Sequence, residues 1–212
     1  MSLLTADYTH CALIVIDFQN DFILPGAPSE IAGSYDVFPA LQQLVTAARQ
    51  NQVPIIHVVR CYLPDGSNVD LCRRELIQKG TVLIPPDSFG ADFPAELKPA
   101  NAPALDWNLL LAGEFQQIGS QEWVMYKSRW GAFYHTNLET FLRERQIDTL
   151  IFSGCNFPNC PRTSIYEASE RDFRLVLAQD AMSGLYEKGL QELANIGVTL
   201  ADTASLTRAL QR

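Results

Sequence analysis

Three side chains in this sequence have the types needed for acid–base and nucleophilic chemistry, and each lies at or just after an apolar run. Asp17 ends the run CALIVID, Lys127 follows QEWVMY, and Cys160 follows DTLIFS after the loop GCNFPN. A cysteine thiolate is a strong nucleophile, and a carboxylate in hydrogen-bond reach can take the thiol proton. These residue types indicate nucleophilic catalysis by cysteine, provided that the fold brings them together.

The sequence around Cys160 indicates a helix that begins at the thiol. Pro161 suits the first position of a helix, because its missing N–H would have no partner there. The positive end of the helix dipole and a nearby Lys127 ammonium are both expected to lower the thiol pKa, and Asp17 could accept the proton if burial raises its own pKa. Each residue also has a structural interpretation, as a small buried thiol, a turn residue and a solvated lysine.

The elements that would position these residues alternate between strand and helix. The run CALIVID is typical of a parallel strand buried on both faces, and open α/β sheets bind ligands at the carboxyl ends of their strands. We predict an α/β fold in one domain, 1–212, with a doubly wound, mostly parallel sheet of six strands and helices on both faces. The expected strands are 11–17, 53–59, 121–126, 148–153, 173–178 and 197–201, and the expected helices are 37–50 (capped by Asp36), 69–79, 137–145, 160–171, 186–195 and 203–210.

The stretch 60–120 is the least regular part of the sequence. Five prolines interrupt its second half, and we expect it to fold over the site or into a subunit interface. Its segment 102–115 contains Trp107, Leu109, Leu110 and Leu111, which would form a sizeable exposed patch on a monomer unless they belong to the core. The segment is therefore expected to belong to a subunit interface or to the core.

Composition and charge exclude several classes of partner. The net charge of -8 repels phosphate backbones, so we expect no nucleic acid to bind. The sequence has no apolar run long enough to span a membrane, and residues 1–10 lack the basic and apolar regions of a signal peptide. Five cysteines without a Cys-x-x-Cys pair favour a reducing cytoplasm over a disulfide framework.

Four sequence blocks together resemble a known family, the isochorismatase-like cysteine hydrolases. They are ALIVIDFQNDF at 12–22, YKSRWGAFYHTNLETFL at 126–142, SGCNFPNCPRTSIYEASERDF at 153–173 and VLAQDAMSG at 176–184. The resemblance implies a Rossmann-like sheet and a catalytic triad of Asp17, Lys127 and Cys160. It also implies a non-proline cis peptide between Cys155 and Asn156, and an oxyanion hole formed by the backbone N–H groups of Asn156 and Cys160.

The resemblance further implies a homodimer or homotetramer, and cleavage of a C–N bond in a small amide, carbamoyl or ureido compound through a thioester. N-Carbamoylsarcosine, ureidoacrylate and biuret amidohydrolases are members with this loop style. The metal-binding Asp-x-His segment of nicotinamidase-like members is replaced here by Cys61 and Leu63, and His57 lies inside a strand, so we expect no metal and no other cofactor. Alternatives are a vinyl ether hydrolase of the isochorismatase type, a non-catalytic binding module, and a redox sensor that uses Cys155 and Cys160.

Adjacency to the triad in sequence suggests which side chains contact a small-molecule substrate. A guanidinium matches the geometry of a carboxylate, so three arginines are candidates for binding one. By adjacency alone, Gln19 is expected to face the pocket and Asn20 to orient Asp17. The substrate-binding candidates are Phe18, Phe22, Trp130, Phe133, Tyr134 and Phe157, with the arginines Arg60, Arg129 and Arg162.

Overall fold

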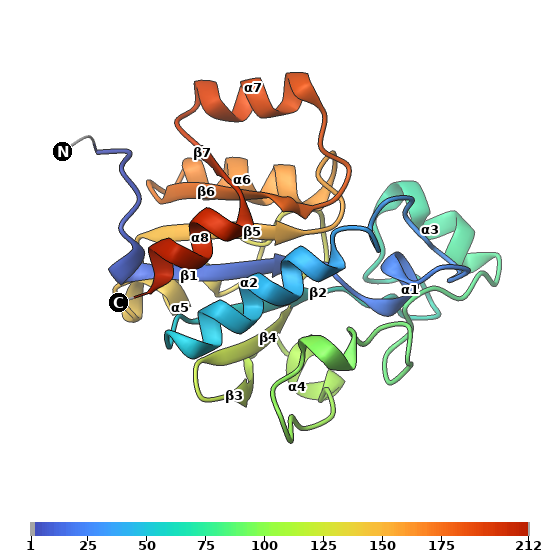
Figure 1. Cartoon of the computed structure of the whole chain (residues 1–212). Coiled ribbons are helices and arrows are strands. Elements are labelled where there is room, and N and C mark those ends of the chain that lie inside the picture. Colours follow the sequence, from blue (N-terminus) through green and yellow to red (C-terminus); the bar gives the residue numbers. More distant parts are fainter. Residues whose placement is uncertain (1–2, 212) are drawn as a thin grey trace.

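The computed structural model of the chain describes residues 3–211. Within them, one sheet has seven strands in the order β3-β4-β2-β1-β5-β6-β7, and every neighbouring pair is parallel except β3 and β4 (Figure 1). The α/β architecture is therefore as expected. The strands are β1 (Cys11–Ile16), β2 (Ile55–Val59), β3 (Gln116–Gly119), β4 (Glu122–Tyr126), β5 (Thr149–Gly154), β6 (Arg174–Met182) and β7 (Thr199–Ala201).

The expected number of six strands was wrong because β3 was overlooked. Only four residues long, β3 turns back on β4 and pairs with it antiparallel at the edge of the sheet. Its sequence, QQIG, has a single large apolar residue, Ile118, and its burial alternates along the strand. So short and polar an edge strand lacks the apolar run that marks the central strands.

Helices cover both faces of the sheet and form two separate cores. Side chains alternate between the faces along each strand, so Leu13 and Val15 of β1 join one core, whereas Ile14 and Ile16 join the other. Helices α2 (Phe38–Gln50), α4 (Trp107–Leu111) and α8 (Thr203–Leu210) contribute to the first core, and α5 (Leu138–Glu144), α6 (Cys160–Ser169) and α7 (Glu187–Asn195) to the second.

One expected helix cap is wrong. The N-cap of α2 is Val37, and no side chain caps this helix end. Asp36 is therefore not the cap that its residue type suggested.

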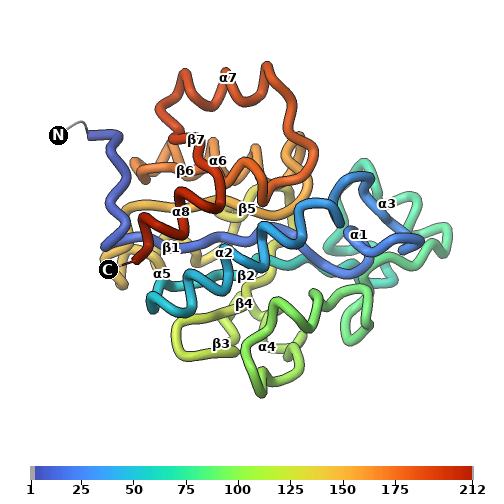
Figure 2. Tube along the Cα trace, in the orientation of Figure 1, coloured from blue at the N-terminus to red at the C-terminus, as the bar shows by residue number. Residues whose placement is uncertain are grey.

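The stretch 60–120 folds over the carboxyl end of the sheet and along one face. Helices α3 (Leu71–Gln78) and α1 (Asn20–Ile23) both lie on the side toward which β1 points (Figures 1 and 2). In segment 102–115, Trp107 and Leu110 are buried in the chain's own core, so these two side chains form no exposed patch. The helices within residues 3–211 are all too short or too polar to cross a membrane.

Candidate active site

A buried ion pair joins the ends of two strands that are not neighbours. Asp17 follows β1 and Lys127 follows β4, with β2 between these strands. The Lys127 Nζ donates to Asp17 Oδ2 over 2.8 Å and to the carbonyl oxygen of Arg129 over 3.1 Å. Lys127 is fully buried and Asp17 is 3% exposed. The second carboxylate oxygen, Oδ1, is buried and has no hydrogen-bond partner among residues 3–211, so it can accept a proton from a group in the site.

The thiol of Cys160 lies at the first residue of α6, after a sharp loop that leaves β5. Gly154 ends β5 with φ +115°, and a Cβ atom there would lie 2.2 Å from the carbonyl oxygen of Ile16 on β1. Only glycine therefore allows this close approach of the two strand ends. The next peptide bond, between Cys155 and Asn156, is cis as expected.

These strand ends and loops line a small cavity of about 20 Å³. That volume corresponds to about one water molecule. Asp17 and Cys160 share its lining with Asn156, Phe22, Arg60 and Trp130, all suggested by the sequence. The remaining lining residues are Ile31, Arg73, Cys155 and Asn159.

Burial has the largest effect on the ionisation of the Cys160 thiol. Cys160 is 5% exposed, and this desolvation, followed by the negative charge of Asp17, raises the pKa of its thiol to about 11 despite the opposing charges of Lys127 and Arg60. The expectation of a lowered thiol pKa was therefore wrong for the site without substrate. Cys160 rests as a neutral thiol that must lose its proton during attack.

The guanidinium of Arg60 lies beside the Cys160 thiol in the cavity lining. Its side chain is 1% exposed, forms an ion pair with Asp70, and places Nη1 3.7 Å from Cys160 Sγ. Its guanidinium also lies 5.2 Å from the ring centroid of Trp130. Because Asp70 compensates its charge, Arg60 fits a positioning role better than the carboxylate-binding role suggested for it.

Six of the suggested substrate contacts, Arg129 among them, do not line this cavity. Phe18 packs against Phe38, Phe133 against Phe173 and Phe157 against Tyr186, so these three rings belong to the core or its border. Tyr134 is 46% exposed and contacts His135. Arg162 points to the surface, where it donates to Tyr186 Oη and Glu192 Oε2, each over 2.6 Å.

The residues suggested by adjacency to Asp17 have structural partners instead. Gln19 is buried and joins two segments, because its amide bonds both backbone groups of Arg60 and the carbonyl of Ala91. Asn20 donates to the carbonyl of Phe89 rather than to Asp17.

Arg129 is also occupied. Its guanidinium donates to the carbonyls of Asn68 and Ser128, over 2.9 and 2.8 Å, which leaves it outside the cavity lining.

Comparison with known proteins places the chain in a family. The model of the isochorismatase domain matches residues 11–205. This chain belongs to the isochorismatase family. The crystal structure of an isochorismatase family protein from Desulfovibrio vulgaris is 32% identical, with a TM-score of 0.81 over 96% of this chain and 99% of that one. A probable inactive nicotinamidase of Arabidopsis thaliana is 29% identical over 90% of this chain and 91% of its own length. An N-carbamoylsarcosine amidase of Arthrobacter sp is 27% identical over 94% of this chain and 70% of its own length.

The residues at the metal-ligand positions of some isochorismatase-family members do not fit a metal here. The side chain of Leu63 has no atom that can bind a metal, and Cys61 is buried in the first core. His57 is buried, stacks on Phe93 and bonds Glu122 Oε1 over 2.7 Å, as expected for a packed histidine. Within residues 3–211, His, Cys, Asp and Glu side chains form no group of three that could hold a metal ion.

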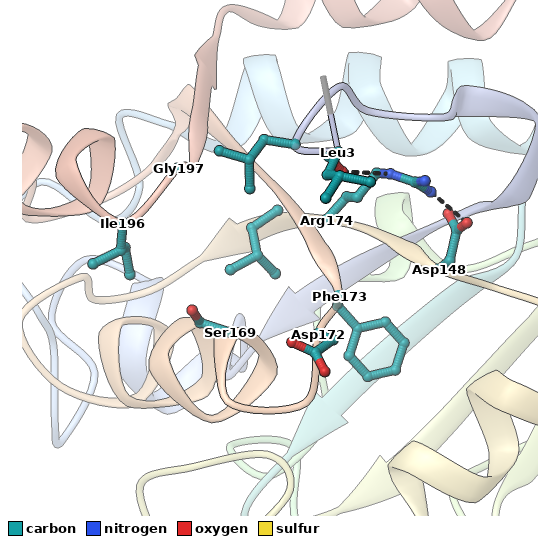
Figure 3. A pocket seen from close by; sticks show the side chains of 10 residues that line it. Leu3, Asp148, Ser169, Asp172, Phe173, Arg174, Ile196 and Gly197 are labelled. Carbon is teal, nitrogen blue, oxygen red and sulfur yellow. Dashed lines mark hydrogen bonds and ion pairs between the residues drawn. The ribbon is translucent and has the colours of Figure 1, made fainter. Parts of the chain in front are cut away.

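A larger cavity of about 530 Å³ lies at the opposite end of the strands, away from their carboxyl ends. It surrounds the amino ends of β5 and β6, and Figure 3 shows Arg174 bonding there to Asp148 and to the backbone of Leu3. Within residues 3–211, no cysteine lines it. Size alone would therefore select a site far from Cys160, and the chemistry of the lining favours the small cavity.

Proposed function

We propose that this chain is a cysteine hydrolase that breaks the C–N bond of a small amide, carbamoyl or ureido compound through a thioester. The observation that carries the proposal is one cavity lined by Cys160 and Asp17, with Lys127 bonded to that carboxylate behind the cavity wall. A nucleophile, a base and a cation that holds the base are the parts that covalent acyl transfer requires.

The first half of the reaction forms the thioester. The Cys160 proton moves to Asp17 as the sulfur attacks the substrate carbonyl carbon, and the backbone N–H groups of Asn156 and Cys160 receive the developing oxyanion. Collapse of the tetrahedral intermediate breaks the C–N bond, and Asp17 returns the proton to the leaving nitrogen, which departs as ammonia or an amine. Lys127 keeps its positive charge throughout and stabilises Asp17 whenever its carboxyl group is deprotonated.

The second half hydrolyses the thioester. Asp17 removes a proton from a water molecule, whose oxygen attacks the acyl carbon. The C–S bond then breaks, and the proton held by Asp17 returns to the sulfur, which restores the neutral thiol. The high thiol pKa supports this order, because the sulfur is reprotonated at the end of each cycle.

The kind of substrate follows from the relatives and from the cavity. The match to an N-carbamoylsarcosine amidase supports carbamoyl compounds. The small cavity supports a compound of few heavy atoms, and the unsuitable residues at the metal-ligand positions argue against metal-assisted binding of nicotinamide. The match to a probable inactive nicotinamidase makes loss of activity the alternative, and Asp17, Lys127 and Cys160 argue against it.

The test is ammonia release from carbamoyl amino acids, ureidoacrylate, biuret and simple amides. The wild type is compared with Cys160→Ser and with Cys72→Ser, a matched variant of an exposed cysteine outside the site. We expect release by the wild type and Cys72→Ser, and none by Cys160→Ser. Release that survives Cys160→Ser would overturn the nucleophile. If no compound reacts, the amidase proposal fails, and isochorismate is the next substrate to test.

A further inference from the structure

The positive charges around the cavity outnumber the negative charges. Asp17 is paired with Lys127, and Asp70 is paired with Arg60. Cys155 and Cys160 are neutral thiols, because burial raises the pKa of each. The remaining charged residue of the lining is Arg73 on α3. Three cations against two carboxylates leave one positive charge without a counterpart.

Arg73 is positioned but not neutralised. Among residues 3–211, no carboxylate oxygen lies within the 4.0 Å of an ion pair with its guanidinium. Nη1 donates to the hydroxyl of Tyr62 over 2.8 Å, and the guanidinium lies 5.0 Å from the ring centroid of Trp130. A phenol and an aromatic ring orient the arginine while leaving its charge intact. Burial raises the pKa of Tyr62, which keeps the phenol uncharged.

The other arginines near the site are occupied. Arg60 is paired with a carboxylate, Arg129 bonds two backbone carbonyls, and Arg162 is paired with Glu192 outside the cavity. Among residues 3–211, Arg73 alone combines a place in the cavity lining with a guanidinium that has no carboxylate in ion-pair distance. In a chain of net charge -8, this is a local cationic site that would attract an anion.

We propose that Arg73 determines specificity by binding a carboxylate of the substrate, so that the preferred substrates are small amides or ureas carrying a carboxylate. This inference rests on the proposed function and narrows it. The reacting carbonyl lies at Cys160 and Asn156, and the carboxylate lies at the Arg73 end of the same cavity. A planar guanidinium can donate to both carboxylate oxygens at once. A substrate with a neutral group at this place cannot accept such a pair of charge-assisted hydrogen bonds.

The test uses two compounds that differ only in this group. N-Carbamoylglycine carries a carboxylate, and 2-hydroxyethylurea has a hydroxymethyl group in its place. The readout is the ratio of kcat/KM for the acid to that for the alcohol, measured by ammonia release. A change in the packing of Trp130 would alter kcat/KM for both compounds. The ratio of the two values therefore reports the contribution of the carboxylate charge.

We expect the wild type to favour the acid and Arg73→Gln to reduce the ratio at least tenfold, as removal of one charge-assisted hydrogen bond does. Arg73→Lys should recover part of the preference. Lys79→Gln is the matched control, because it removes one positive charge from the end of the same helix, where Lys79 is exposed and pairs with Glu75. A ratio near one in the wild type, or an equal fall in Lys79→Gln, overturns the proposal.

Binding to Cys160→Ser by calorimetry separates this inference from the function beneath it. Tighter binding of N-carbamoylglycine than of 2-hydroxyethylurea, lost in Arg73→Gln, supports the carboxylate site even if the wild type releases no ammonia, in which case the proposed function fails alone. Turnover of the two compounds at equal efficiency supports the function and overturns the carboxylate site. Equal or absent binding of N-carbamoylglycine overturns it as well.

Discussion

Replacing Asp17 by asparagine should abolish turnover and, at the same time, make the thiol of Cys160 more acidic. Asp17 is the proposed base, and loss of a general base costs about 10²–10⁴ in rate. Its negative charge is also the second largest cause, after burial, of the raised thiol pKa. The rise from 9.0 to about 11 disfavours the thiolate by about 3 kcal/mol. Removing the carboxylate should therefore bring the thiol pKa below 11 while burial still keeps it above the ordinary value.

Asparagine suits this position for a structural reason. Asp17 has φ +49°, in the left-handed region that asparagine tolerates and most other residues do not. The variant leaves the Lys127 ammonium buried without its carboxylate, which should cost about 3–5 kcal/mol of stability. Thermal unfolding must therefore establish that the protein remains folded at the assay temperature.

Two assays check the combined prediction. Ammonia release gives kcat, and the rate of iodoacetamide alkylation of Cys160 against pH, followed by mass spectrometry of its peptide, gives the thiol pKa. Asp21→Asn is the control, because Asp21 lies close by in sequence, in α1, and accepts from the backbone N–H of Ile84. A folded Asp17→Asn protein with a kcat within tenfold of the wild type, or with an unchanged or higher thiol pKa, would refute the reasoning.

Three further changes test the surroundings of the site. Gly154→Ala places a methyl group against the carbonyl oxygen of Ile16 and should lower the free energy of unfolding by at least about 1 kcal/mol. An unchanged midpoint of urea unfolding would contradict the close approach of the two strand ends. Arg162→Ala should leave KM for an acidic substrate unchanged, since Arg162 lies outside the cavity, and an increase in KM would restore its suggested role. Burial opposes ionisation of Glu122, but hydrogen bonds from Arg49 and His57 outweigh it and lower its pKa. The stability from Glu122 is therefore present above its unfolded pKa of about 4.3 and lost as pH falls toward the folded value. In Glu122→Gln, the free energy of unfolding should therefore fall less steeply as the pH is lowered. A pH dependence equal to that of the wild type would contradict this prediction.

The strand ends that carry the proposed triad could be predicted from the sequence, because central parallel strands are continuous apolar runs. The pairing of Asp17 with Lys127 could not. It requires the order β4-β2-β1, in which Lys127 reaches past β2, and a spacing of 110 residues does not specify strand order. The sign of the thiol pKa shift was missed because the depth of burial of Cys160 depends on tertiary packing.

The substrate contacts were predicted least well. Adjacency to a catalytic residue does not decide which way a side chain points, so Phe133 and Phe157 proved to be core residues. Arg73 was overlooked because it lies in the irregular stretch 60–120, far in sequence from Asp17, Lys127 and Cys160. The sequence shows Arg73 only as an arginine in the first turn of a short predicted helix, after an acidic residue. This pattern is common on protein surfaces, so it does not indicate a binding site.

Both edges of the sheet end in very short strands, and this limits how copies of the chain can associate. The edge strands β3 and β7 have four and three residues. Each offers few unpaired backbone groups, so neither is a good template for a strand from another molecule. Growth of one sheet across two subunits, and aggregation by the same route, should be disfavoured. A dimer or tetramer would therefore associate through helices and loops, where side chains rather than backbone hydrogen bonds determine the partner.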